Sequence, residues 1–202
     1  MALEKGIEQL VQEFIAAGRP SSRHQNINAR RAGYVASTGL AGEVETRIHV
    51  ETHVLEGLII RVFSPPNAPE TLPATIYYHG GCFISGGFDT HDNQLRQLAW
   101  YGNCRVIAVQ YRLAPEHTFP TAHDDAERGA ILVWQYANTL GVDKNRITLC
   151  GDSAGGHLAL VTALRLKAKG LWQPAQLILI YPMLDATASF ESYTLNGTDY
   201  II

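Results

Sequence analysis

The sequence has 202 residues, of which 46% are hydrophobic and 17% are charged, so it is long enough to fold around a core of its own. The formal net charge of -3 gives no reason to expect a nucleic acid as partner, and no apolar run is long enough to span a bilayer. The first residues lack the basic start and apolar middle of a secretory signal, so we expect a cytoplasmic protein.

The N-terminal part of the chain predicts helices. Apolar residues recur at helical spacing from Leu3 to Ile15, which indicates an amphipathic helix that ends at Ala17-Gly18. A second, weaker helix is expected over residues 26–38. From about residue 45 the pattern changes to strands over residues 46–55 and 58–63, joined by a turn, so we expect a hairpin there.

The middle of the chain alternates between short apolar runs and helix-like segments. The expected strand and helix pairs are residues 74–78 and 90–101, residues 105–110 and 121–139, and residues 146–150 and 154–169, followed by a last strand over residues 176–181. Such alternation predicts a mostly parallel sheet with helices on both faces, here preceded by the antiparallel hairpin. The fold class is therefore α/β.

Cysteine and histidine residues are dispersed. Cys82, Cys104 and Cys150 have neither the even number of a disulfide framework nor the spacing of metal ligands. His49 and His53 alternate along an expected strand, so we interpret them as solvent-facing. No metal site is predicted.

The stretch Gly151-Asp-Ser-Ala-Gly-Gly156 lies between an expected strand and an expected helix. Gly-x-Ser-x-Gly in that place is the pattern of a nucleophile elbow, in which a sharp turn exposes the serine beside a helix N-terminus. The alternative is that Ser153 is only a helix N-cap. The glycines of His79-Gly-Gly-Cys-Phe83, directly after the first parallel strand, favour the elbow, because backbone N–H groups of that loop can complete an oxyanion hole.

Three blocks together resemble a known family: His79 to Phe83, Tyr111-Arg-Leu-Ala-Pro-Glu-His-Thr-Phe-Pro120, and Gly151 to Gly156. The chain resembles the hormone-sensitive-lipase-like (family IV) esterases of the α/β-hydrolase fold, and is similar to bacterial acetyl esterases. The resemblance implies Ser153 as nucleophile and the backbone N–H groups of Gly80, Gly81, Cys82 and Ala154 as the oxyanion hole. It implies a serine carboxylic-ester hydrolase that acts on small short-acyl esters and uses no cofactor.

The resemblance also implies a domain organisation. Residues 1–44 are expected to form the first part of a helical cap, residues 45–185 an incomplete hydrolase core, and residues 186–202 the start of a second cap segment. The fold would be truncated after the sixth strand. The acid and the histidine of the family both lie beyond residue 202, so we expect them from further sequence or from a second chain.

Two residues inside the sequence are candidates for the missing roles. His157 lies one helical turn after Ser153, but we expect it to pack at the helix flank. Asp185 comes one strand too early for the acid of the family, and we expect it to cap a turn. Cys82 replaces the third glycine of the family; a cysteine nucleophile is disfavoured because no base lies nearby and Ser153 has the elbow.

Two rival functions remain open. A chain without the base could act as a ligand-binding module, as plant gibberellin receptors do, which resemble this family. It could also be an inactive fragment, because the last strand would leave an exposed sheet edge. The expected partner is a small-molecule ester, and association with copies of itself is left open.

Overall fold

The computed structural model describes residues 3–18 and 24–195. The chain divides into two compact units, one from the segments before Tyr34 and after Leu184, and one from Tyr34–Leu184. The first unit holds helix α1 (Lys5–Ala16), most of helix α2 (Ile27–Ala36) and helix α6 (Glu191–Leu195). Both predicted N-terminal helices are present, and α2 begins where the Asn26 side chain accepts a hydrogen bond from the Ala29 N–H at 2.9 Å.

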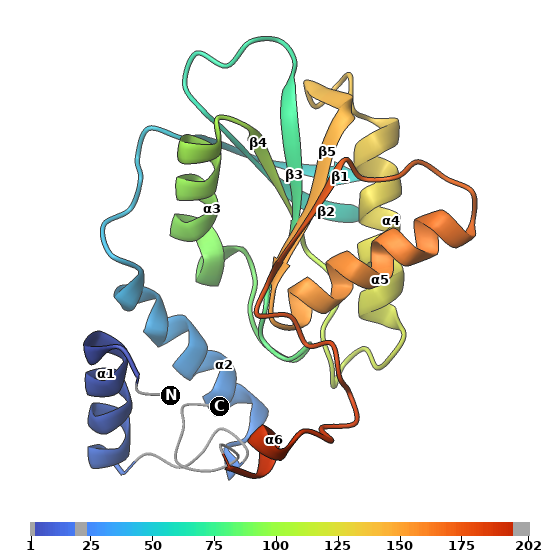
Figure 1. The fold of residues 1–202 in the computed structure, drawn as a ribbon. Coiled ribbons are helices and arrows are strands. Elements are labelled where there is room, and N and C mark those ends of the chain that lie inside the picture. The colour runs from blue at the N-terminus through green and yellow to red at the C-terminus, as the bar shows by residue number, and fades with distance from the viewer. Residues whose placement is uncertain (1–2, 19–23, 196–202) are drawn as a thin grey trace. The chain divides into compact units, whose positions relative to one another are not determined.

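The second unit contains a six-stranded mixed sheet with the strand order β1-β2-β4-β3-β5-β6 (Figure 1). Its strands are β1 (His49–Leu55), β2 (Leu58–Ser64), β3 (Leu72–Tyr78), β4 (Arg105–Val109), β5 (Val142–Asp152) and β6 (Gln176–Ile180). Strands β1 and β2 form the predicted hairpin, β2 pairs antiparallel with β4, and the four remaining strands run parallel. The predicted α/β architecture is confirmed.

The β1–β2 hairpin has a two-residue turn at Glu56-Gly57. Leu55 pairs with Leu58, and both turn residues have positive φ angles, 49° and 87°. Positive φ at both positions matches the right-handed twist of the flanking strands, and glycine accepts it without strain. The turn therefore fixes the register of the sheet edge.

Helices cover both faces of the sheet. Helix α3 (Phe88–Gly102) packs on one face, while α4 (Thr121–Gln135) and α5 (Ala154–Ala168) pack on the other (Figure 1). Two separate clusters of buried residues result, one with Leu95 and Ala99 of α3, the other with residues of α4 and α5. Central strand β3 is buried on both sides, since Ile76, Tyr77 and Tyr78 are fully inaccessible, which explains its continuous apolar run.

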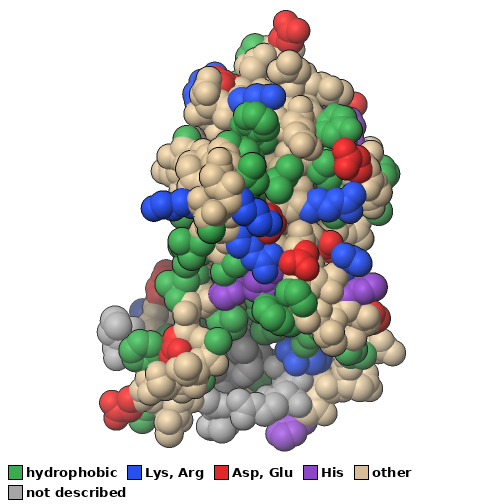
Figure 2. Space-filling model, turned by 90° about the vertical axis from the view of Figure 1, so that its right-hand side faces the viewer, with side chains coloured by type: hydrophobic (Ala, Val, Ile, Leu, Met, Phe, Trp, Pro, Cys, Tyr) green, Lys and Arg blue, Asp and Glu red, His purple; other side chains and the backbone are tan. Residues whose placement is uncertain are grey.

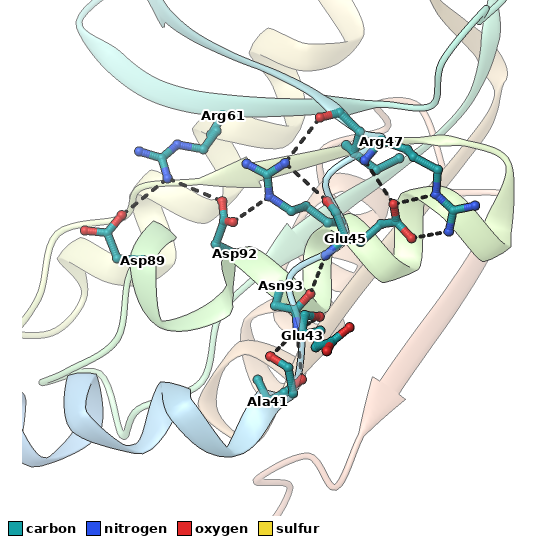
Figure 3. A network of polar contacts seen from close by, with 11 residues as sticks. Ala41, Glu43, Glu45, Arg47, Arg61, Asp89, Asp92 and Asn93 are labelled. Carbon is teal, nitrogen blue, oxygen red and sulfur yellow. Dashed lines mark hydrogen bonds and ion pairs between the residues drawn. The ribbon is translucent and has the colours of Figure 1, made fainter.

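The loop before β1 is fastened to α3 by one amide side chain (Figure 3). Asn93 accepts a hydrogen bond from the Glu45 N–H at 3.1 Å and donates to the carbonyl oxygens of Ala41 and Glu43 at 2.7 and 2.9 Å. Around it, Arg61 approaches Asp89 and Asp92. The Asn93 contacts hold the loop against α3, and the Arg61 contacts join β2 to the same helix.

Charges of both signs are interspersed on the face of the molecule drawn in Figure 2, with apolar side chains between them. Such mixing produces no extended field of one sign on that face. None of the described helices is sufficiently long and apolar to cross a membrane.

Candidate active site

Ser153 is the single residue between β5 and α5, and its backbone has the geometry of a nucleophile elbow. Its φ and ψ angles are 53° and -117°, which a residue with a side chain rarely adopts. Its N–H donates to Ile180 at 2.9 Å, and its carbonyl oxygen accepts the N–H groups of His157 at 3.1 Å and Met183 at 3.2 Å. Strain of this kind costs about 1–3 kcal/mol and persists only where surrounding contacts enforce it.

The glycines around Ser153 allow three backbone segments to meet. A Cβ at Gly155 would lie 1.8 Å from the carbonyl oxygen of Tyr78, and one at Gly151 would lie 2.3 Å from the Gly155 backbone. No side chain fits at either position. The start of α5 therefore rests directly on the end of β3, where the loop from His79 begins.

The N-cap alternative for Ser153 fails on geometry. Ser153 occupies the N-cap position of α5, yet within the described part of the chain its side chain makes no capping hydrogen bond. A capping serine has extended backbone angles, which Ser153 lacks. Its side chain is partly exposed, while Asp152 and Ala154 on either side are buried. The hydroxyl is therefore not used for capping.

The loop after β3 has an unusual run of left-handed backbone angles. Gly81, Cys82 and Phe83 have φ values of 121°, 55° and 61°. The carbonyl oxygen of Gly81 accepts three hydrogen bonds, from the N–H groups of Ile84 and Ser85 at 3.1 and 3.0 Å and from the Ser85 hydroxyl at 3.0 Å. None of the described residues accepts a hydrogen bond from the N–H of Gly81 or Cys82. The loop holds its carbonyls within the protein and leaves these amide donors available.

Gly80 differs from the other residues predicted for the oxyanion hole. Its N–H donates to Oδ1 of Asp152 at 2.9 Å, so it is already engaged inside the protein. This hydrogen bond argues against the oxyanion role predicted for Gly80, which instead anchors the loop to Asp152. Ala154 is the first residue of α5, where an N–H has no partner within the helix.

Asp152, directly before Ser153, is a buried carboxylate with three donors. It accepts the Tyr77 hydroxyl at 2.8 Å and the Gly80 N–H at 2.9 Å, and Nε2 of His91 lies 3.3 Å from Oδ1. Burial alone would raise the pKa of Asp152, but the hydrogen bonds from His91, Tyr77 and Gly80 outweigh it and lower that pKa below its ordinary value. A negative charge therefore lies behind the elbow.

His79 is buried and neutral at physiological pH. Burial lowers the pKa of His79 to about 4, and its Nδ1 donates to the carbonyl oxygen of Gly80 at 2.7 Å. The Tyr111 hydroxyl donates to the His79 carbonyl oxygen at 2.6 Å, and the two rings stack with centroids 4.3 Å apart. Both contacts stabilise the first turn of the loop, so His79 has a structural part in the site.

His157 lies at the flank of α5, as its position in the sequence predicts. Its Nδ1 donates to the Met183 carbonyl oxygen at 2.9 Å, and its Nε2 lies 3.1 Å from Nε2 of His123. The two Nε2 atoms are within hydrogen-bond distance, so one ring donates to the other. Both ring nitrogens are thereby engaged away from Ser153.

Asp185 behaves as a turn former. Its carboxylate accepts the N–H of Thr187 at 2.9 Å and that of Ser189 at 3.2 Å, together with both hydroxyl groups. The hydrogen bonds from Thr187 and Ser189 lower the pKa of Asp185 to about 2. This is the expected capping arrangement.

Arg112 and Asp125 form a contact that the sequence analysis missed. The guanidinium donates two hydrogen bonds to the buried carboxylate, each at 2.8 Å, and the Arg112 N–H adds a third at 2.9 Å. Asp125 is a buried residue of α4. Its partner fixes the segment after β4, beside the loop from His79.

The three cysteines are free thiols; Cys82 is exposed, and the other two are buried. In the part of the chain that the structure describes, no group of three or more His, Cys, Asp or Glu side chains is arranged to hold a metal ion.

A strained, partly exposed serine after a parallel strand, next to a loop with available amide donors, is the arrangement of α/β-hydrolase active sites. Residues 75–202 match the model of a family described as having the alpha/beta hydrolase fold, and the chain belongs to that family. The fold and the family resemblance inferred from sequence are confirmed.

Characterised relatives of the chain are esterases. It is 34% identical over 204 residues to the ethyl acetate hydrolase of Pseudomonas putida, covering 96% of this chain and 64% of the relative. It is 39% identical over 156 residues to carboxylesterase NlhH of Mycobacterium tuberculosis, covering 76% and 49%. A hyperthermophilic esterase from Pyrobaculum calidifontis superposes with a TM-score of 0.88 at 36% identity, over 100% of this chain and 66% of that one. The chain thus spans less than two thirds of the length of these relatives.

Proposed function

We propose that this chain carries the nucleophile and the oxyanion hole of a serine carboxylic-ester hydrolase for small short-acyl esters. The observation that carries the proposal is the elbow: Ser153 has strained backbone angles and a partly exposed side chain, and its neighbours Asp152 and Gly155 contact the start of the loop at His79 and Gly80. The esterase activity of the relatives supports the reaction class.

In the proposed reaction, Oγ of Ser153 attacks the ester carbonyl carbon and the bond to the alcohol oxygen breaks. The N–H groups of Gly81, Cys82 and Ala154 hold the oxyanion while it exists, which is typically the largest contribution to such catalysis. The alcohol leaves with the serine proton. Water then attacks the acyl carbon, and the carboxylic acid is released with Ser153 restored.

The base that moves these protons is proposed to lie outside the sequence, with the triad acid. His157 and Asp185 are the candidates that the sequence offers for these roles, and both are engaged in other hydrogen bonds. Histidine and aspartate from sequence beyond Ile202, or from a second chain, complete the site in this proposal.

The test uses the chain together with the sequence or second chain that supplies the acid and the base, and a p-nitrophenyl alkylphosphonate, which labels an activated serine covalently. We expect intact-mass analysis to show one label per chain and peptide mapping to place it on Ser153. Ser153→Ala should abolish labelling, whereas Cys82→Ser should retain it. A label on Cys82, or equal labelling of Ser153→Ala, would contradict the proposal.

Turnover of p-nitrophenyl acetate and p-nitrophenyl octanoate then tests the substrate class. We expect faster turnover of the acetate wherever the acid and base are present. Both ring nitrogens of His157 already have partners, so this histidine does not supply the missing base. For the chain by itself, this favours a ligand-binding module as the second candidate function. Tight binding of a small ester without phosphonate labelling would assign that function.

A further inference from the structure

His91 is a buried histidine that the proposed reaction does not use. It lies in the first turns of α3, and only 4% of its surface is exposed. Its Nε2 lies 3.3 Å from Oδ1 and 3.5 Å from Oδ2 of Asp152, while its Nδ1 lies 2.9 Å from the Thr90 hydroxyl oxygen. Both ring nitrogens thus have defined partners.

The hydrogen-bond partners determine where the His91 proton is. An ionised carboxylate can only accept, so Nε2 must carry hydrogen to face Asp152. The Thr90 hydroxyl can serve Nδ1 as donor or as acceptor, because it has both capacities. Nε2 therefore carries a proton whether the Thr90 hydroxyl donates to Nδ1 or accepts from it.

Aromatic rings enclose this pair. Tyr34 of α2 meets the His91 ring edge-on at 6.0 Å between centroids, and the rings of His79 and Tyr77 lie at 5.6 and 6.1 Å. Apart from His91, the donors to Asp152 are the neutral Tyr77 hydroxyl and the Gly80 N–H. Among the described residues, His91 is the donor to this carboxylate that can itself carry a positive charge.

We propose that His91 is a positioning residue of the active site. Its Nε2–H fixes the Asp152 carboxylate, which holds the Gly80 N–H and so orients the next two amides, those of Gly81 and Cys82, toward the reacting carbonyl. This rests on the proposed function for its effect on catalysis, but the hold on Gly80 does not depend on it.

The first measurement is hydrogen exchange of the Gly80 amide, followed by NMR. We expect His91→Leu to speed that exchange about tenfold or more, since a hydrogen bond to a charged group is lost. His91→Gln retains an N–H donor near the position of Nε2 and should stay within about threefold of the wild type. His53→Leu, the same substitution on strand β1, is the matched control and should leave the exchange unchanged. Equal exchange in the His91→Leu and His53→Leu variants would overturn the proposal.

The second measurement is the rate of Ser153 labelling by the alkylphosphonate. We expect His91→Leu to lower the maximal labelling rate about tenfold with little change in half-saturating phosphonate concentration, and His91→Gln to restore most of it. A higher half-saturating phosphonate concentration with an unchanged maximal labelling rate would overturn a positioning role. If the wild type is not labelled, the proposed function fails, while Gly80 exchange still tests His91.

A third measurement needs no variant and covers the case in which His91→Leu does not fold. A long-range proton–nitrogen NMR correlation of the wild type should show a protonated Nε2 on His91 that exchanges slowly with water. A bare Nε2 would overturn the proposal.

Discussion

The negative charge of the Asp152 carboxylate, behind the elbow, can be tested by removing one of the hydrogen-bond donors to it. Tyr77→Phe deletes the hydroxyl that donates to Oδ1 at 2.8 Å and accepts the Gln94 side-chain amide at 2.7 Å. Tyr111→Phe is the matched control, because its hydroxyl donates at 2.6 Å to an uncharged acceptor, the His79 carbonyl. Both rings are buried, so phenylalanine preserves the packing in each case.

The two substitutions should differ in cost. A hydrogen bond to a charged group contributes about 1.5–3 kcal/mol, and one between neutral groups contributes about 1 kcal/mol. We therefore expect Tyr77→Phe to lower the free energy of unfolding by about 2–3 kcal/mol and Tyr111→Phe by about 1 kcal/mol. Urea unfolding followed by tryptophan fluorescence measures both, and an unchanged m-value would show that the unfolded state is not altered.

The pH dependence gives a second, independent check on the charge. Because the pKa of Asp152 is lowered in the folded state, its contribution is complete above the unfolded value of about 3.9 and is lost as the pH falls through the folded value. The extra cost of Tyr77→Phe should therefore be the same at neutral pH and at mildly acidic pH. Equal costs for the two variants, or an extra cost that increases on acidification, would refute the assignment of a buried carboxylate.

Two other substitutions test separate parts of the structure. Gly155→Ala should lower the free energy of unfolding by about 3 kcal/mol in thermal melts, because its Cβ would meet the Tyr78 carbonyl oxygen at 1.8 Å, whereas Gly33→Ala, with open space, should not destabilise. Burial lowers the pKa of His79 to about 4 in the folded state, compared with about 6.5 in the unfolded state. The free energy of unfolding should therefore fall by about 3 kcal/mol as the pH drops between these values, and His79→Asn should flatten that slope in urea titrations.

The sequence predicted the order of elements well, because each apolar run matches the period of its strand or helix. Boundaries were less accurate where long-range pairing decides them. Strand β5 begins at Val142, before the predicted start, since Val142 pairs with Leu72 across a register shift in the sheet. Helix α4 ends at Gln135, before the predicted end at residue 139. The turn that follows it is closed by a hydrogen bond from the Val142 N–H to the Ala137 carbonyl oxygen.

The candidate site was predicted only in its local part. The motif indicated Ser153, and the structure gives it elbow angles; its catalytic role stays a prediction. The role of Asp152 could not be predicted from the motif, in which it occupies an unspecified position. Its partners come from β3 and α3, which are distant in the sequence. His91 carried no signal in the sequence beyond being one of the dispersed histidines. A buried polar network is a property of packing, and only the fold brings its members together.

Strand β6 contributes more to the site than its place at the sheet edge suggests. The last strand residue, Ile180, receives the amide hydrogen of Ser153, and Met183 just beyond it donates to the serine carbonyl. The proposed nucleophile is therefore held by two neighbouring strands, because it follows β5 in the chain and is hydrogen-bonded to the end of β6. Loss of the hydrogen bonds to Ile180 and Met183 would release the serine backbone from its strained angles, so the β5–β6 ladder helps to set the orientation of the hydroxyl.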